Sequence, residues 1–155
     1  MSKQDFCFHY ATRVRYSEID AQGIVFNSHY LTFFDIAIVE YMRHLPYDYA
    51  AGVEKSGNDF HTVKAVVEFK NPARFDDQLE VWTRTSDLGR SSITFAFEIY
   101  RKDEDVLLTD GQVVWVNVDQ ATAKTVPLPE ALVERVFSTE TVAPRRSSQP
   151  AAPSA

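Results

Sequence analysis

Residues 28–45 contain no glycine or proline, and they carry apolar side chains at helical spacing on nearly every side. One broad stripe is formed by Tyr30, Phe33, Phe34, Ala37, Ile38, Tyr41 and Leu45, and it is widened by Leu31, Ile36, Val39 and Met42. A helix over this segment is roughly 27 Å long, and its apolar surface has to be covered by other elements. The rest of the chain must therefore supply a layer that covers a long central helix.

That remaining sequence shows the period-two alternation that is typical of strands. The first predicted strand carries Phe6, Phe8, Tyr10, Thr12, Val14 and Tyr16 at alternate positions, and four more strands are predicted at residues 61–70, 78–88, 91–102 and 106–119. Short connections between these four predict an antiparallel meander. We therefore expect an α+β fold in which an antiparallel five-stranded sheet is wrapped around the central helix.

The length of 155 residues fits one domain, which we place at residues 1–140. A short last helix is predicted at residues 130–137. Residues 141–155 are mainly Pro, Ser and Ala, and they lack the large apolar side chains that offset the entropy cost of ordering, so we expect disorder there. Cys7 is the only cysteine, which excludes an intrachain disulfide and favours a half-buried thiol on a strand.

The formal net charge of −6 and a pI near 5.2 argue against a nucleic acid or an anionic membrane as partner, because both favour a basic face. The amino terminus lacks the basic start and apolar run of a secretory signal, and no segment is long and apolar enough to span a bilayer, so we expect a cytoplasmic protein. One sheet that covers one helix leaves edge strands exposed. Pairing two such edges predicts a homodimer as the minimum assembly.

A carboxylate stands in a glycine-containing turn just ahead of the helix. Asp20 is followed by Gly23, and Asn27 lies at or near the helix start. Backbone N–H groups in a first helical turn have no partner within the helix, so they can stabilise an oxyanion while a nearby carboxylate attacks or activates water. The competing interpretation is that Asp20 is only a turn or capping residue, and that the side chain of Asn27 caps the helix.

Several longer stretches occur in a definite order and spacing. They are residues 15–31 (RYSEIDAQGIVFNSHYL), residues 67–79 (VEFKNPARFDDQL), Gly89-Arg90-Ser91-Ser92 followed by alternating Ile93, Phe95, Phe97 and Ile99, and the ending VNVD at 116–119 with VPLP at 126–129. In this order the sequence resembles the hot-dog fold thioesterases, specifically the family of 4-hydroxybenzoyl-CoA thioesterase and short-chain acyl-CoA thioesterases. The resemblance covers nearly the whole folded part of the chain.

This resemblance implies an acyl-CoA thioesterase that hydrolyses an acyl-CoA to the free acid and CoA. Asp20 matches the catalytic aspartate and would act as nucleophile or general base, while the backbone N–H of Asn27 would polarise the thioester carbonyl. The expected substrate-binding residues near them are Gly23, Val25, His29, Tyr30 and Phe34. The active site would lie at a subunit boundary of a homodimer or, as is common in the family, a homotetramer. No metal or other cofactor is implied, because coenzyme A is part of the substrate.

The phosphates of coenzyme A call for basic side chains and free backbone donors. Arg90, with Ser91 and Ser92 in the turn after Gly89, is the preferred group. Arg74, Arg101 and Lys102 are the next candidates.

Two other functions remain open at this point. A hot-dog hydratase or dehydratase acts on the same thioesters with a catalytic histidine, for which His29 is the only candidate, and a non-catalytic acyl-CoA binding module needs no catalytic group. The other histidines, His9, His44 and His61, lack the spacing of metal ligands. Glu40 shares a helical face with apolar residues, and we expect it to anchor the helix to a strand or a second subunit rather than to act in catalysis.

Overall fold

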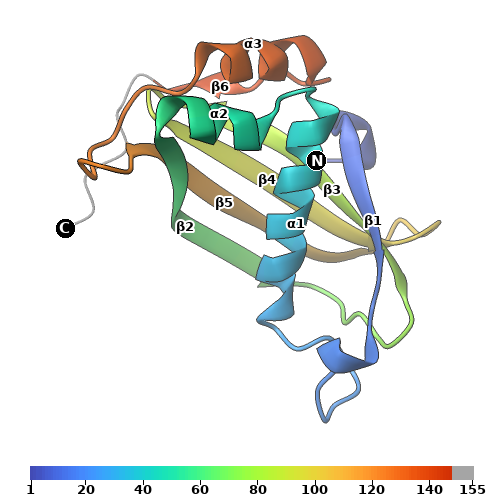
Figure 1. Cartoon of the computed structure of the whole chain (residues 1–155). Coiled ribbons are helices and arrows are strands. Elements are labelled where there is room, and N and C mark those ends of the chain that lie inside the picture. Colours follow the sequence, from blue (N-terminus) through green and yellow to red (C-terminus); the bar gives the residue numbers. More distant parts are fainter. Residues whose placement is uncertain (148–155) are drawn as a thin grey trace.

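The structure is a computed structural model, and it describes residues 1–147. Five strands form an antiparallel sheet in the order β1-β3-β4-β5-β2 (Figure 1). They are β1 (Phe8–Arg13), β2 (Asn58–Phe69), β3 (Gln78–Leu88), β4 (Ser92–Arg101) and β5 (Leu107–Asp119). The helices are α1 (His29–His44), α2 (Tyr49–Ser56) and α3 (Glu130–Thr139), with short 3-10 turns at Lys3–Asp5 and Tyr16–Glu18. The predicted combination of an antiparallel sheet with helices is confirmed.

The predicted meander is correct only for β3, β4 and β5. The strand β2 pairs with β5 and not with β3, so β2 and β1 occupy the two edges of the antiparallel part. The connection at residues 70–77 makes this possible, because it spans roughly 25 Å when extended and the two strands are only about 14 Å apart. The sequence shows that this connection is short, but its length does not specify which strand β2 joins.

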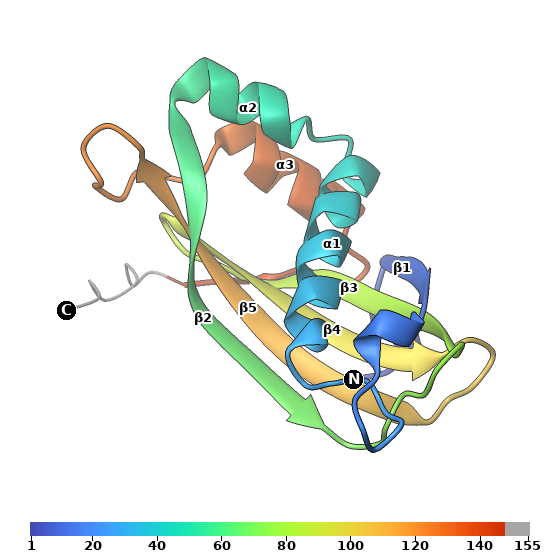
Figure 2. The same ribbon diagram turned by 60° about the horizontal axis from the view of Figure 1, so that its bottom comes forward.

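The helix α1 lies across one face of the sheet (Figures 1 and 2). Its buried side chains pack against the inward residues of β4, which alternate as predicted at Ile93, Phe95, Phe97 and Ile99. Phe34 stacks on Phe97 with ring centroids 4.2 Å apart. Gly111 on β5 makes room for this stack, because a Cβ there would lie 2.6 Å from Cε2 of Phe34.

The opposite side of α1 stays exposed in the single chain. Leu31, Asp35 and Arg43 lie on this side, and Leu31 keeps 43% of its surface accessible. The edge strand β2 is also exposed along most of its length, including the apolar side chains of Val63 and Val66. Within residues 1–147, one chain therefore covers its helix on the sheet side only.

A sixth strand, β6 (Arg145–Arg146), pairs in parallel with Asp87 and Leu88 of β3 (Figure 1). It belongs to the segment that composition predicts to be disordered. Its order comes from backbone pairing with β3 and from an ion pair of Arg145 with Asp87 at 2.8 Å, neither of which needs an apolar side chain. Residues 148–155 of the predicted disordered tail lie outside the described residues.

At the other end of the chain, Cys7 is half-buried just ahead of β1, and its Sγ lies 3.6 Å from Oε2 of Glu140. No helix in residues 1–147 is both long enough and apolar enough to cross a membrane. The predicted cytoplasmic location stays a prediction.

Candidate active site

Asp20 lies in a tight turn whose backbone fixes the carboxylate. Its N–H donates to the carbonyl of Ile24 at 2.9 Å, and its carbonyl accepts from the N–H of Gly23 at 2.9 Å. Gly23 has a φ of 72°, a left-handed conformation that glycine adopts without the steric cost of a Cβ. The N–H of Gln22 donates to Oδ1 of Asp20 at 2.8 Å. The second carboxylate oxygen makes no hydrogen bond or ion pair within residues 1–147, so it is available to a ligand.

A cavity of about 360 Å³ opens beside this turn. Its wall consists of Asp20, Gln22, Ile24, Val25, Asn27 and Tyr30 on one side and of Phe69, Lys70, Asn71 and Pro72 on the other. Most of this lining is apolar, and Asp20 is the only carboxylate in it. The cavity can hold an apolar group with a carboxylate at its rim.

The N-terminus of α1 is part of the same site. The helix begins at His29, and the side chain of its N-cap residue Ser28 makes no capping hydrogen bond. The backbone N–H groups of Asn27 and Ser28 donate to no acceptor in residues 1–147, and the side chain of Asn27 is exposed and caps nothing there. Asn27 lies on the cavity wall, so its N–H is available to a carbonyl or oxyanion there, and the N–H of the neighbouring Ser28 is unpaired in residues 1–147.

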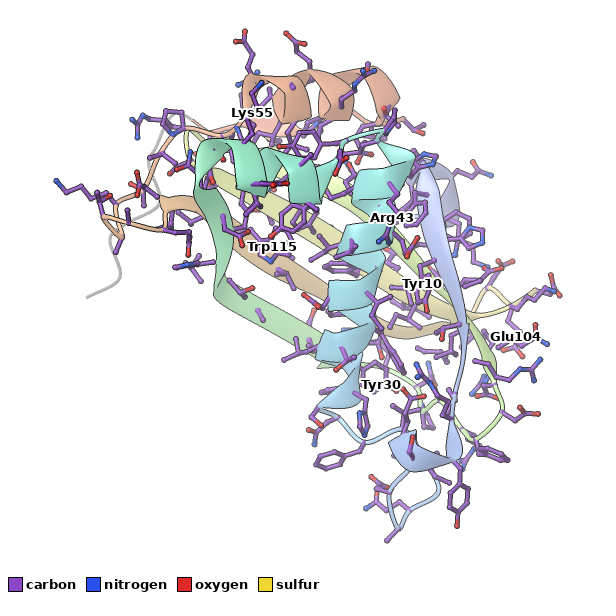
Figure 3. The ribbon with its side chains drawn as sticks, in the orientation of Figure 1. Tyr10, Tyr30, Arg43, Lys55, Glu104 and Trp115 are labelled. Carbon is purple, nitrogen blue, oxygen red and sulfur yellow. The ribbon has the colours of Figure 1, made fainter. Side chains whose placement is uncertain are left out.

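Tyr30 forms the buried part of the wall. Its ring is 3% exposed and packs edge-on against Phe69, with centroids 5.3 Å apart (its position is labelled in Figure 3). Burial raises the pKa of Tyr30, although contacts with Ala73 and Thr109 oppose the shift, so the phenol is neutral at neutral pH. Tyr30 therefore offers an apolar ring and an uncharged hydroxyl.

The chain has clear relatives among known proteins. A family model described as the thioesterase-like superfamily matches residues 14–136, which include the turn, the cavity and every strand of the antiparallel sheet except β1. The chain belongs to this superfamily.

One curated relative is the acyl-CoA thioester hydrolase YbgC of Escherichia coli, which is 32% identical over 126 residues, covering 81% of this chain and 92% of that protein. Among solved structures, a hypothetical protein of Aquifex aeolicus is 29% identical with a TM-score of 0.75, covering 83% of this chain and 98% of the other. A thioesterase of Thermus thermophilus, solved with coenzyme A and zinc, is 25% identical with a TM-score of 0.74, covering 88% and 96%. The expected hot-dog thioesterase family and the enzyme class of thioester hydrolase are confirmed.

The other predicted substrate-binding residues near Asp20 lie in three different environments. Gly23 shapes the turn beside the cavity, whereas His29 lies at the helix start with its ring against Phe26 and is not on the cavity wall. Phe34 is fully buried against Phe97 and also lies off the wall. Of the predicted group around the acyl site, the cavity thus brings together Asp20, Val25, Asn27 and Tyr30.

Arg90, Ser91 and Ser92 lie at the far end of the sheet from the cavity of the same chain. Arg90 and Ser91 lie in the turn before β4 and Ser92 begins this strand, whereas Arg101 at the other end of β4 donates to the carbonyl of Pro72 on the cavity wall. The strand between them is roughly 30 Å long. Ser91 is buried and its carbonyl accepts from the N–H of Asn117 at 2.8 Å. A single chain does not bring these three residues to Asp20, and their role stays a prediction.

The other basic candidates differ in how they are engaged. Arg101 donates to Asp77, Glu104 and Pro72, and its bond with Asp77 raises its pKa, so it stays charged. Arg74 is exposed on the loop that carries the cavity wall, and its guanidinium has no partner in residues 1–147. Lys102 is exposed in the turn after β4. Of these three, Arg74 is the basic residue free to bind an anion near the cavity.

Glu40 was predicted to be partly buried and to anchor the helix. It is partly buried, as predicted, with 40% of its side chain exposed, but it pairs with Arg43 on the same helix and not with a strand of the same chain. The prediction from helical spacing assumes that other elements pack against every side of α1. Glu40 lies toward the side of α1 that is exposed in the single chain. Glu40 takes no part in the cavity.

A second group of titratable residues lies near the C-terminal end of α1. The carboxylate of Glu140 accepts hydrogen bonds from the hydroxyl of Tyr41, from the N–H of Thr85 at 2.7 Å and from the thiol of Cys7. Burial raises the pKa of Glu140, and burial together with the nearby Glu140 raises the pKa of Cys7 to about 12. The thiol is therefore protonated and is not an activated nucleophile.

Sequence reasoning missed the side of the cavity wall that faces the Asp20 turn. Phe69, Lys70, Asn71 and Pro72 belong to the stretch 67–79 that marks the family resemblance, but nothing in the pattern indicates that this stretch faces Asp20. A group of three or more His, Cys, Asp or Glu side chains close enough to hold a metal ion is not present in residues 1–147.

Proposed function

We propose that this thioester hydrolase is an acyl-CoA thioesterase that releases a free acid and CoA at the cavity beside Asp20. One observation carries the proposal: Asp20 is fixed through a single oxygen, and its other oxygen shares a cavity wall with the open N-terminus of α1. The acyl-CoA thioester hydrolase of Escherichia coli supports the choice of substrate class.

The reaction follows from these positions. The thioester carbonyl oxygen accepts from the free N–H groups of Asn27 and Ser28, which makes its carbon more electrophilic. In one route, an Asp20 oxygen attacks this carbon, the carbon–sulfur bond breaks, CoA leaves as a thiolate that takes a proton, and water hydrolyses the resulting anhydride. In the other route, Asp20 takes a proton from water as the water oxygen attacks, and the proton passes to the departing sulfur. Neither route needs a metal or another cofactor.

The apolar part of the cavity accounts for binding of the acyl group. Val25, Tyr30 and Phe69 line it, and burying an acyl chain or ring against them releases water from apolar surface. The cavity of about 360 Å³ is open at one side, so its apolar wall can contact an acyl group that extends beyond it.

We also propose a homodimer that pairs the β2 strands of two copies edge to edge, and a homotetramer made of two such dimers. A two-fold axis perpendicular to the sheet makes the two β2 strands antiparallel. Both copies of α1 then lie on the same face of the joined sheet, and the partner subunit lies next to a groove of about 240 Å³ between α1 and β2 that is lined by Leu31, Asp35 and Ala65 among others.

The same arrangement supports a role for Arg90 in binding CoA phosphates. Antiparallel pairing brings the far end of one sheet next to the cavity end of the other, so the partner subunit's Arg90 approaches Asp20 from across the boundary. Arg74 of the same chain approaches from the other side.

A thiol-release assay across short, long, branched and aromatic acyl-CoAs tests the function, with enoyl-CoA and 3-hydroxyacyl-CoA included. Free thiol from at least one acyl-CoA, with no hydration of the enoyl-CoA, supports the thioesterase. Turnover of the enoyl-CoA without thiol release favours the hydratase, and binding of acyl-CoA with no turnover at all favours the binding module. The hydratase has less structural support, because His29 lies off the cavity wall.

A further inference from the structure

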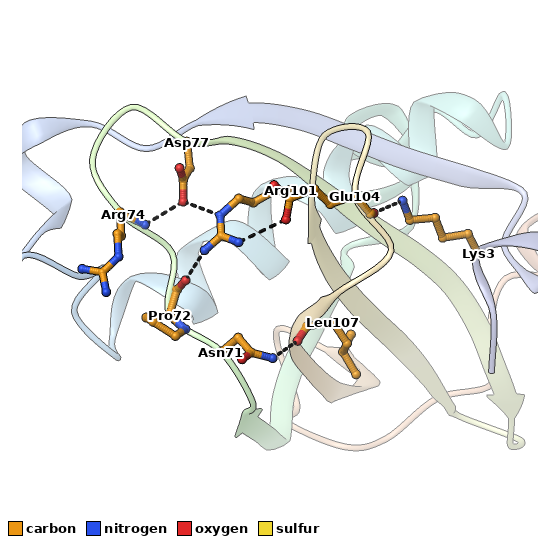
Figure 4. A network of polar contacts seen from close by, with 8 residues as sticks. All are labelled: Lys3, Asn71, Pro72, Arg74, Asp77, Arg101, Glu104 and Leu107. Carbon is orange, nitrogen blue, oxygen red and sulfur yellow. Dashed lines mark hydrogen bonds and ion pairs between the residues drawn. The ribbon is translucent and has the colours of Figure 1, made fainter.

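The loop at residues 70–77 forms one wall of the cavity, although it contains no helix and no regular strand. It runs from the end of β2 to the start of β3, past the turn between β4 and β5 (Figure 4). A loop without its own secondary structure depends on contacts with its neighbours for a defined position. The contacts that hold this loop therefore decide where the cavity wall lies.

Arg101 at the end of β4 binds this loop at two separate points. Its Nη2 donates to the carbonyl of Pro72 at 2.7 Å, and its Nε donates to Oδ2 of Asp77 at 2.8 Å. Its Nη1 donates to Glu104 at 3.2 Å, so the planar guanidinium is held from three directions (Figure 4). The same Oδ2 of Asp77 also accepts from the N–H of Arg74 at 2.8 Å. One guanidinium thus bonds the loop at Pro72 and at Asp77, and the end of the loop is also bonded to Val14, whose N–H donates to the carbonyl of Asp77 at 2.9 Å.

The beginning of the loop is held independently. The N–H groups of Lys70 and Asn71 both donate to the carbonyl of Leu108, and Nδ2 of Asn71 donates to the carbonyl of Leu107 at 2.8 Å. These bonds do not involve Arg101. Loss of Arg101 is therefore expected to loosen residues 72–77 and to leave residues 70–71 in place.

The other side of the loop is bonded to the turn that carries Asp20. The carbonyl of Ala73 accepts from the N–H of Val25 at 2.9 Å, and Arg74 forms a bridge with Ile24. Ile24 in turn accepts from the N–H of Asp20. A path of hydrogen bonds and peptide bonds therefore runs from Arg101 through Pro72 and Ala73 to Val25, Ile24 and Asp20.

We propose that Arg101 is a positioning residue for the reaction, which sets the position of Asp20 and of the opposite cavity wall without touching the substrate. The proposal rests on the proposed thioesterase function. It also makes Arg101 a weaker candidate for the CoA phosphates than Arg74, because three of its five N–H donors are bound to Asp77, Glu104 and Pro72.

The Arg101→Lys variant tests the geometry rather than the charge. Lysine keeps the positive charge, but its single ammonium cannot reproduce the planar fork that reaches Pro72 and Asp77 together. Because a small displacement of a catalytic group slows the chemical step, we expect kcat to fall by about tenfold to a hundredfold while KM changes by less than about threefold. A purely structural ion pair would be largely restored by lysine.

The matched control is Arg84→Lys. Arg84 is another arginine of the sheet, more deeply buried than the partly buried Arg101, and it also donates to a backbone carbonyl, that of Val142 at 2.9 Å. It has no hydrogen-bonded path to Asp20 among the contacts in residues 1–147. We expect Arg84→Lys to lower the melting temperature without lowering kcat.

A second measurement is independent of activity. Amide hydrogen exchange of the intact protein should become faster in Arg101→Lys at residues 72–77 and also at residues 20–27, whereas Arg84→Lys should leave residues 20–27 unchanged. Unchanged exchange at residues 20–27 in Arg101→Lys, or a kcat equal to that of the wild type, overturns the positioning role. If the wild type releases no thiol but the exchange at residues 20–27 responds to Arg101, the thioesterase function fails and the link from Arg101 to Asp20 stands.

Discussion

The backbone N–H of Gln22 donates to Oδ1 of Asp20 at 2.8 Å, so one oxygen of the carboxylate is part of the turn and the other is not. An asparagine can accept the same hydrogen bond with its own Oδ1, whereas an alanine cannot. We therefore expect Asp20→Asn to unfold at nearly the same denaturant concentration as the wild type. Asp20→Ala should lose about 1 kcal/mol in the free energy of unfolding. Equal losses in both variants, measured by urea titration, would contradict this account of the turn.

Gly111 is expected to be intolerant of even a methyl group. A Cβ at this position would lie 2.5 Å from the carbonyl oxygen of Val66 and 2.6 Å from the ring of Phe34. Gly111→Ala should cost about 1–3 kcal/mol in the free energy of unfolding, because the stacked ring must move.

The double variant Gly111→Ala with Phe34→Leu separates the two clashes. The smaller side chain relieves the contact with the ring but not the contact with the backbone, so we expect partial recovery relative to the sum of the single losses. A simple sum of both losses would show that the Phe34 contact is not the cause.

Because the pKa of Glu140 is raised in the folded protein, we expect the free energy of unfolding to depend on pH. Burial raises its folded-state pKa above the ordinary value of 4.5, so the folded protein holds this proton more tightly than the unfolded chain does. The resulting stabilisation is complete below the unfolded pKa and is lost as the pH rises through the folded pKa. Glu140→Gln cannot titrate, so the difference in unfolding free energy between wild type and variant should change with pH above about 4.5.

Denaturant titrations between pH 4 and pH 8 check this expectation. Glu98 and Asp110 also have pKa values raised by burial, and they act equally in both proteins, so the comparison isolates Glu140. A difference that stays constant over this range would mean that Glu140 titrates normally.

The proposed homodimer depends on pairing of the exposed β2 edges. Lysines at Val63 and Val66 in both copies would place like charges next to each other in an antiparallel β2 pair. We expect analytical ultracentrifugation to find an oligomer for the wild type and a monomer for Val63→Lys with Val66→Lys. Val106→Lys is the control, because Val106 is 52% exposed but lies outside β2. A monomeric wild type, or a double variant that remains oligomeric, would exclude this interface.

The sequence predicts where the helices and strands lie along the chain better than it predicts which strands pair with one another. Period-two and helical alternation locate β3, β4 and α1 because each repeat reflects a buried face, as the burial of Phe95 and Phe97 confirms. The pairing of β2 with β5 was not predictable, because a connection of given length allows several partners. The order of Arg145–Arg146 was also missed, because it depends on backbone pairing and not on composition.

The site was predictable only near Asp20. The turn with Gly23 and the helix that follows are adjacent in sequence, so one short motif contains the carboxylate and its neighbouring donors. Pro72 comes from a distant stretch, and only the folded chain shows that it faces Asp20. Arg90 and Phe34 are close to recognisable motifs in sequence but not to the cavity of the same chain.

The most direct test of the central claim is the rate of thiol release from the best acyl-CoA by wild type and by Asp20→Asn under single-turnover conditions. We expect the wild type to release thiol and Asp20→Asn to be slower by about a hundredfold or more, because the variant keeps the turn but can neither attack the thioester nor accept a proton. Equal rates in the two folded proteins would contradict the claim that the Asp20 carboxylate carries out the hydrolysis.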